Sequence, residues 1–128
     1  MLEVELGKMA AHKATTSRVK NFGNMLITDH SDALHKIKNI SRQRFLTLPE
    51  GTGDKNTQMI NKMNEEKAGS FDKAYIKMMI KDHQTDIKEF EKAADNIKDT
   101  TVIIFINSTL PLLRKHLDSC IAIDKWIQ

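Results

Sequence analysis

The fold is decided by the stretch SRVKNFGNMLITDH at residues 17–30, which returns as SFDKAYIKMMIKDH at residues 70–83. Aligned without gaps, the two stretches share Ser, Lys, Met, Ile, Asp and His, and Phe22 corresponds to Tyr75. Their apolar residues recur every three or four positions, which is the period of an amphipathic α-helix. The repeat therefore predicts two long helices that arose by duplication of a helical hairpin.

The same period continues on both sides of the repeat and predicts five helices. The first covers about residues 1–14. The second follows hydroxyl-bearing cap residues at positions 15–17 and runs to about residue 45. A loop is expected at residues 47–54, where Pro and two Gly interrupt the pattern. A short third helix follows this loop.

The fourth helix is expected to begin at a cap formed by Ser70, after Gly69 ends the third, and to run to about residue 97. Asp99 is the expected N-cap of the fifth helix, which runs nearly to the end of the chain. Because short links join long helices, neighbouring helices should be antiparallel. The sequence predicts an all-α, up-down bundle of about five helices with a duplicated hairpin, forming a single domain over residues 1–128.

The composition argues against several classes of protein. Cys120 is the single cysteine and cannot form a disulfide within the chain. The net charge is +3, but the lysines alternate with acidic residues, as on a solvated helical face. Aromatic residues make up 5% of the chain, which disfavours the stacking surfaces that bind nucleic acid. No apolar run approaches the roughly 20 residues of a membrane-spanning helix. We therefore expect no nucleic-acid partner and no spanning segment, while a protein or envelope partner stays open.

The beginning of the chain, MLEVELGKM, has the pattern of the middle of an amphipathic helix and lacks an N-cap. A natural helix is expected to begin with a capping residue. We therefore expect a leader and part of the first helix to precede residue 1.

Three of the five histidines fall on the apolar faces of the long helices. His30 and His83 end the two repeated stretches, roughly 20 Å along their helices. If the last helix folds back on the fourth near residue 98, His116 comes within about one turn of the height of His83. The sequence thus predicts that three inward histidines meet at one level of the bundle.

Acidic residues are expected close to these histidines. Glu3 and Glu5 reach the same height if the first helix folds back on the second, and Asp29 and Asp82 flank the apolar stripes. Imidazoles and carboxylates are ligands of Fe, Mn and Zn in helical bundles. One hypothesis is therefore a metal site, with the Asp residues as ligands or as hydrogen-bond partners of the histidines. Its candidate residues are His30, His83, His116, Glu3, Glu5, Asp29 and Asp82.

Two other interpretations of the inward histidines stay open. The first is buried polar packing, in which each imidazole bonds an Asp or Tyr75 on a neighbouring helix and fixes the register of the helices. The second is a site for another small ligand or for proton chemistry. A hydrogen bond from each inward histidine would favour packing. Convergent histidine nitrogens about 4 Å or less apart, with ligand distances near 2.0–2.2 Å once an ion is bound, would favour a metal.

The chain also resembles a known bacterial family, through the segments EVELGKMA, VKNFGNMLITDH, FDKAYIKMMIKDHQTDIKEFEKAA and TLPLLRKHL. This is the ferritin-like family of domains of unknown function numbered 4142, whose members are often labelled predicted outer membrane proteins. The resemblance extends from residue 3 to about residue 117. It implies a ferritin-like bundle in an exported protein, periplasmic or otherwise extracytoplasmic, and brings no established activity. Di-iron bundles use Glu-x-x-His twice, and this motif is missing from the sequence, so ferroxidase activity is not predicted.

The sequence and the resemblance together favour an exported, non-enzymatic helical domain with a metal or small-ligand site between its long helices. The first alternative is a redox or hydrolytic metalloenzyme that uses the core histidines as ligands of Fe, Mn or Zn. The second is a module that lays an apolar helical surface on a partner or a lipid. A contiguous exposed apolar patch would favour this last alternative.

Overall fold

The computed structural model describes residues 2–43 and 54–127, which form five α-helices and no β-strand. The helices are α1 (Leu2–Lys13), α2 (Ser17–Gln43), α3 (Asp54–Glu65), α4 (Ala68–Asn96) and α5 (Thr100–Ile127). The predicted all-α class is confirmed. Most of the predicted loop, residues 47–53, lies outside the described residues, and residue 54 already belongs to α3.

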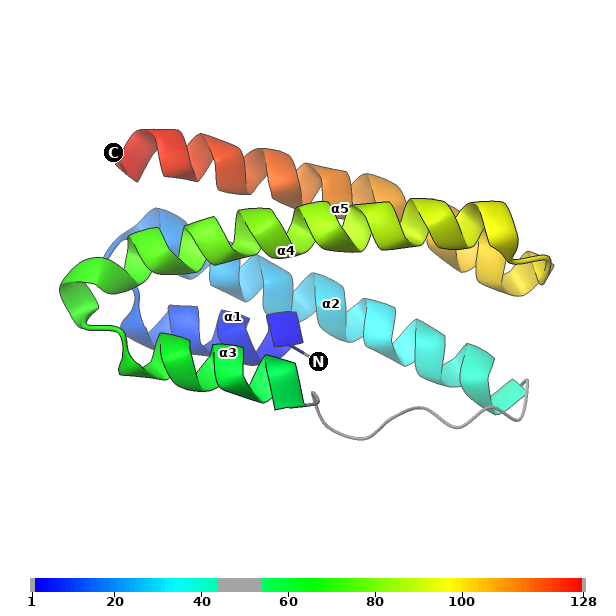
Figure 1. Ribbon diagram of the computed structural model, residues 1–128, viewed down its shortest axis with the longest axis horizontal. Coiled ribbons are helices and arrows are strands. Elements are labelled where there is room, and N and C mark those ends of the chain that lie inside the picture. Colours follow the sequence, from blue (N-terminus) through cyan, green and yellow to red (C-terminus); the bar gives the residue numbers. More distant parts are fainter. Residues whose placement is uncertain (1, 44–53, 128) are drawn as a thin grey trace.

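Two pairs of helices form the body of the molecule (Figure 1). α1 packs antiparallel along α2, and α4 packs antiparallel along α5. The pairs meet where α2 contacts α5 and α1 contacts α4, while α3 lies against α1. Helix lengths repeat, with 12 and 27 residues followed by 12 and 29, but α3 has few contacts with α4. The repeat is thus visible in the lengths of the helices and not in how the two short helices pack.

The caps of the long helices follow the sequence prediction at two of three places. The Asp99 carboxylate accepts the backbone N–H of Thr101 at 2.9 Å and so caps α5. The Thr16 hydroxyl accepts the N–H of Val19 at 3.3 Å at the start of α2. The predicted cap at Ser70 is wrong, because α4 begins at Ala68. The N–H of Ser70 already donates to the Lys67 carbonyl at 3.0 Å, so the helix is wound before this residue is reached.

Buried polar contacts fix the ends of the helices to one another. Asp72 of α4 accepts the backbone N–H groups of Thr15 and Thr16, both at 2.9 Å, and thereby caps α2 from outside. The Lys13 ammonium donates to the Asn64 carbonyl at 2.6 Å and the Glu66 carbonyl at 2.8 Å, at the C-terminal end of α3. These contacts link the α1–α2 turn to the α3–α4 turn.

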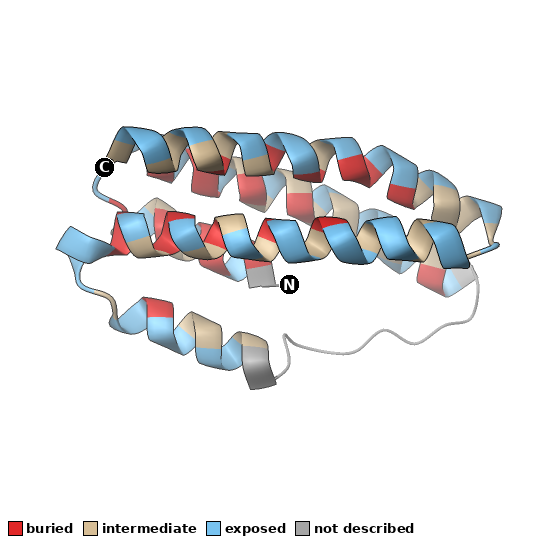
Figure 2. Ribbon diagram, turned by 45° about the horizontal axis from the view of Figure 1, so that its top comes forward, coloured by how far each residue is buried: buried red, intermediate tan, exposed pale blue. Residues whose placement is uncertain are grey.

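The core consists of two hydrophobic clusters, which are separated by a layer of buried histidines. Along α4, Met79 belongs to the first cluster and Ile87 to the second, with His83 between them. Along α5, the buried residue Cys120 belongs to the first cluster, while the second lies on the other side of the histidine layer. Figure 2 shows buried residues on the inner sides of the helices and mostly exposed residues on α3.

The second cluster consists of residues from α4, α5 and the link between them, and α2 contributes none. Beyond His30, the inner face of α2 borders a cavity of about 630 Å³. Ala33 and Ile37 line this cavity on the α2 side.

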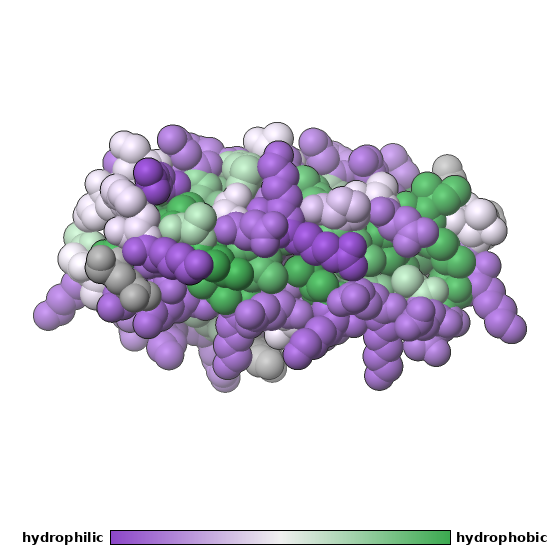
Figure 3. Space-filling model, turned by 90° about the horizontal axis from the view of Figure 1, so that it is seen from above, coloured by the Kyte–Doolittle hydropathy of each residue, from purple (hydrophilic) through white to green (hydrophobic). Residues whose placement is uncertain are grey.

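The outer surface carries few large apolar side chains in the described part of the chain. Ile104 is 64% exposed and Trp126 is 49% exposed. The two lie roughly 33 Å apart along α5, and the Arg18 guanidinium covers the Trp126 ring at 4.4 Å from its centroid. Figure 3 shows hydrophobic side chains in a band along the middle of one face and in a group at the end where α4 meets α5, with long hydrophilic side chains on either side of the band. Across the described residues, no helix combines the length and apolarity needed to cross a membrane.

Two glycines set the close approach of α1 to α2. A Cβ atom added to Gly23 would lie 2.9 Å from both the Ala10 Cβ atom and the Gly7 carbonyl oxygen, and a Cβ on Gly7 would lie 2.8 Å from the Gly23 carbonyl oxygen. Backbone atoms cannot yield as a flexible side chain can, so any larger residue pushes the helices apart. This spacing also holds the start of α1 against the middle of α2.

Gly23→Ala is expected to lower the free energy of unfolding by about 1–2 kcal/mol, because the clash outweighs the better helix propensity of alanine. The matched control is Gly69→Ala in α4, where an added Cβ meets nothing within 4 Å. That variant should be neutral or more stable by up to about 1 kcal/mol. Urea denaturation of both variants measures the difference, and equal effects would contradict the tight α1–α2 contact.

Candidate metal centre

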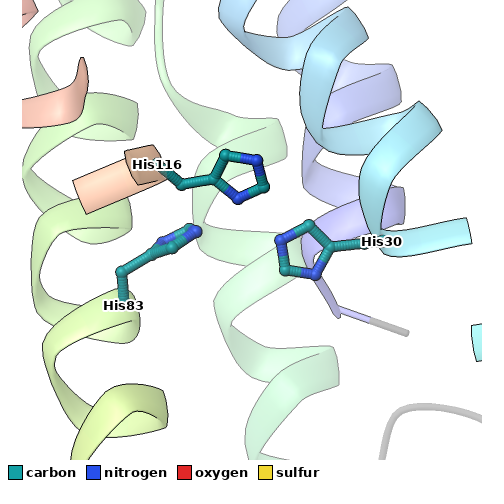
Figure 4. A group of neighbouring side chains, drawn as sticks. All are labelled: His30, His83 and His116. Carbon is teal, nitrogen blue, oxygen red and sulfur yellow. The ribbon is translucent and has the colours of Figure 1, made fainter. Parts of the chain in front are cut away.

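Three histidines from three helices meet between the two hydrophobic clusters (Figure 4). His30 comes from α2, His83 from α4 and His116 from α5, and the rings point toward one another. Their exposed fractions are 7%, 0% and 0%. Ring centroids are 5.4–5.7 Å apart, and one nitrogen from each ring lies within 4.8 Å of the others. The predicted convergence of these side chains at one level is therefore present.

The backbone of α4 fixes the orientation of one ring. His83 Nδ1 lies 2.8 Å from the Met79 carbonyl oxygen, one helical turn earlier. A carbonyl oxygen only accepts hydrogen bonds, so Nδ1 carries the proton and the neutral ring keeps its lone pair on Nε2. That Nε2 is buried and has no hydrogen-bond partner among the described residues.

A carboxylate fixes the second ring in the same way. His116 Nε2 lies 2.7 Å from Asp29 Oδ2, so Nε2 donates and the lone pair of the neutral ring is on Nδ1. Carboxylate–histidine pairs of this kind orient the ligands of metal ions in proteins. His116 Nδ1 and His30 Nε2 are also buried without a partner in the described part of the structure. Each ring thus has one buried nitrogen that bonds none of the residues in ranges 2–43 and 54–127.

Burial keeps two of the rings neutral at physiological pH. It lowers the pKa of His30 to about 4, against a partly compensating attraction from Glu3. Burial also lowers the pKa of His83. Because only an unprotonated imidazole nitrogen binds a metal ion, these rings are in the state that coordination requires.

A pair of carboxyl groups lies beside the histidines. Glu3 is 8% exposed and is hydrogen-bonded to Asp86 of α4. Burial alone raises the pKa of Glu3, but the bond from Asp86 and the nearby histidines outweigh it and lower that pKa. Burial and the bond to Glu3 raise the pKa of Asp86 to about 8. Near neutral pH, Asp86 is therefore protonated, and its O–H donates a hydrogen bond to the Glu3 carboxylate.

The acidic residues named from the sequence have different positions. Glu3 reaches the cluster, and Asp29 bonds His116. Glu5 does not reach it, because two residues further along α1 the side chain is turned by about 200°. It is exposed and pairs with Lys8 at 3.5 Å. Asp82 lines the cavity beside the cluster.

Asp86 is a site residue that the sequence analysis did not name. It follows His83 by three positions and so lies on the same face of α4. The His-x-x-Asp spacing marks the pair in the sequence, because it places the two side chains one helical turn apart. The di-iron motif Glu-x-x-His has the acidic residue first and therefore does not identify Asp86.

Buried polar packing accounts for only part of the site. The Asp29–His116 bond is a contact of that kind, whereas Tyr75, the other expected partner, has a buried hydroxyl with no partner among the described residues. Three buried ring nitrogens remain unbonded, and each such group costs about 1–3 kcal/mol. A purely structural cluster would be expected to satisfy them.

The spacing of the rings suits an ion after a small closure. The limit of 4.8 Å exceeds the roughly 4 Å expected between the nitrogens of a metal site. An ion equidistant from the three nitrogens would lie at most about 2.8 Å from each, and zinc–imidazole bonds are about 2.0–2.1 Å, so the rings would move inward by up to roughly 0.7 Å. Glu3 is an oxygen donor that lines the cavity beside the histidines, and the cavity itself leaves room for a water or another ligand.

The comparisons with known proteins agree with the resemblance in the sequence. The family model described as "Domain of unknown function (DUF4142)" matches residues 1–123. No curated protein and no solved structure matches the chain.

Proposed function

We propose that this chain, which belongs to the DUF4142 family of domains of unknown function, binds one divalent transition-metal ion. The ligands are His30 Nε2, His83 Nε2 and His116 Nδ1, with the Glu3 carboxylate as the fourth. Asp29 holds His116 in its binding orientation, and the protonated Asp86 donates a hydrogen bond that favours the ionised form of Glu3.

The observation that carries this proposal is the convergence of three buried histidines. One nitrogen from each ring lies within 4.8 Å of the others, and each ring has a buried nitrogen with no partner among the described residues. Burying such groups without a partner is unfavourable, and a cation would satisfy all three at once. The neutral state of His30 and His83 supports the same reading, because no proton has to be displaced from those nitrogens near neutral pH.

Three nitrogens and one oxygen form a ligand set for zinc, ferrous iron or manganese. Affinity for such a site rises in the order Mn²⁺, Fe²⁺, Zn²⁺. We therefore expect Zn²⁺ to bind most tightly in vitro, while the ion held in the cell also depends on supply.

Elemental analysis of protein purified without an affinity tag tests the proposal. The expected result is close to one metal ion per chain, or uptake of one Zn²⁺ by chelator-treated protein. His83→Ala should lose the ion, and Glu5→Gln should keep it because that side chain is exposed and paired with Lys8. Failure of wild-type protein to hold or take up any of the three metals would overturn the proposal.

Asp29→Asn tests how His116 is oriented. Asparagine carries no negative charge, so it accepts the hydrogen bond from His116 Nε2 more weakly than Asp29 does. The His116 ring is then less firmly held in one tautomer, and its Nδ1 is a weaker base for the metal ion. The expected loss is about 10- to 100-fold in Zn²⁺ affinity, measured by competition with a chromophoric chelator. Asp32→Asn, on the exposed side of α2, is the control and should change the affinity by less than about twofold.

A metal-dependent enzyme of the redox or hydrolytic class is a second candidate. The cavity favours it, because His30 and Glu3 line its wall and a substrate could approach the ion from that side. Turnover of peroxide by the Fe²⁺ form, or of an activated ester by the Zn²⁺ form, would support this candidate. Rates equal to those of His83→Ala would exclude it for those substrates.

A further inference from the structure

The cavity beside the histidines is acidic although the chain as a whole is basic. Lys and Arg number 20 against 17 Asp and Glu. Yet the described residues that line the cavity include no Lys or Arg. They do include five acidic residues, Glu3, Asp29, Asp82, Asp86 and Glu89. Such a distribution attracts a cation and repels an anion.

Part of the cavity wall is apolar and partly aromatic. Phe90 of α4 and Phe105 of α5 lie with ring centroids 6.3 Å apart at an interplanar angle of 49°. Ile37, Leu112 and Leu113 complete this wall. Aromatic faces attract cations as well as apolar groups, so both walls favour the same charge.

One metal ion does not account for a space of this size. The cavity has a volume of about 630 Å³, within the range of small-molecule sites, whereas a bound water takes up only roughly 30 Å³. Along α4, Glu89 lies about 9 Å from His83, beyond the reach of an ion held by the histidines. Glu89 and Phe90 thus remain available at the far end of the cavity.

His30 marks the inner end of the cavity, next to the other two histidines. It is 7% exposed, lines the cavity, and has a buried Nε2 without a partner among the described residues. The inner end of the cavity is therefore polar and incompletely satisfied, whereas the outer end combines carboxylates with aromatic rings.

We propose that this cavity binds a small organic cation with an apolar body, of the class of primary amines that carry an aromatic ring. The ammonium group pairs with the carboxylate of Glu89, and the ring lies against Phe90, Phe105 and Leu112. The proposal does not depend on the metal, because these groups are separate from the three histidines.

Three indole compounds that differ in the charge of the side chain test the proposal. Tryptamine is a cation, tryptophol is neutral and indole-3-acetate is an anion, while the ring is the same. Calorimetric titrations use the full chain in its metal-free and its Zn²⁺-treated states. Tryptamine should bind with a stoichiometry of one, about tenfold or more tighter than tryptophol, and indole-3-acetate should bind more weakly still.

Two variants of α4 locate the ammonium group. Glu89→Gln should weaken tryptamine binding by about 5- to 10-fold and leave tryptophol unchanged. Glu91→Gln is the matched control, because Glu91 is exposed and pairs with Arg114 at 3.7 Å. It should leave tryptamine binding unchanged.

Indole-3-acetate binding as tightly as tryptamine, or equal losses in the two variants, would overturn the proposal. The same holds if tryptamine fails to bind at millimolar concentration. Since the metal-free chain is titrated as well, binding of tryptamine without uptake of Zn²⁺ would contradict only the metal site. Uptake of Zn²⁺ without binding of tryptamine would contradict only the amine site.

Discussion

His30→Leu is expected to lower the affinity for Zn²⁺ by about 100- to 1,000-fold without destabilising the metal-free chain. Zinc sites in small domains contribute about 10–16 kcal/mol, so one of four ligands accounts for roughly 3–4 kcal/mol. Each 1.4 kcal/mol corresponds to about a factor of ten in affinity. Calorimetry in the presence of a competing chelator measures the loss.

The free energy of unfolding of metal-free His30→Leu shows whether His30 is a metal ligand or a residue that stabilises the fold. Leucine removes a buried nitrogen that has no partner among the described residues, and burial of that ring already lowers the pKa of His30 to about 4. The free energy of unfolding should therefore stay equal or rise by about 1 kcal/mol. If His30 instead fixed the register of the helices, the variant would lose about 1–3 kcal/mol.

His35→Leu provides the control on the same helix. His35 is exposed, as the sequence predicted, and lies five residues beyond His30 on α2. Neither Zn²⁺ affinity nor stability should change by more than about 0.5 kcal/mol. An equal loss of affinity in both variants would mean that Zn²⁺ binds to surface histidines and not to the buried cluster.

Asp86→Asn is expected to raise the stability of the metal-free protein at pH 7 by about 1–3 kcal/mol. Burial and the bond to Glu3 raise the pKa of Asp86 to about 8, from 3.8 in a model compound. The folded chain thus keeps a proton that the unfolded chain releases. The contribution of Asp86 to the free energy of unfolding is full below pH 3.8 and is lost as the pH rises toward 8.

Asparagine retains an N–H donor for Glu3 and needs no proton for it. The variant should therefore gain stability over wild type as the pH rises from 5 to about 8, which denaturation at pH 5, 7 and 8 would measure. Asp95→Asn, at an exposed position of α4, should show no such trend. A constant difference across the three pH values would mean that Asp86 is already ionised in the folded protein.

The helices and the meeting of the histidines could be predicted because both follow from regular geometry. Apolar residues spaced by three and four mark the inner face of each helix. A rise of about 1.5 Å per residue then fixes heights once the short links set the direction of each helix. His30, His83 and His116 were placed together in this way, and the structure brings them within 4.8 Å.

Features that depend on side-chain rotation or on the packing of short helices could not be predicted. Glu3 and Glu5 were predicted to lie together because their positions along the helix axis are similar. The rotation about that axis turns the two side chains to different sides of α1. The cavity depends on how the helices pack against one another, and a repeat pattern does not reveal which face borders such a space. The position of α3 depends on carbonyl groups that Lys13 bonds, which no periodic pattern marks. The ferritin-like label and the extracytoplasmic location stay predictions.

X-ray absorption at the zinc edge of the Zn²⁺-treated protein tests the central claim most directly. The account predicts three imidazole nitrogens at about 2.0–2.1 Å, with the multiple scattering of intact rings, and one carboxylate oxygen at a similar distance. His83→Ala should remove one imidazole from this shell. A shell of oxygen ligands without imidazole scattering, unchanged in His83→Ala, would contradict the account.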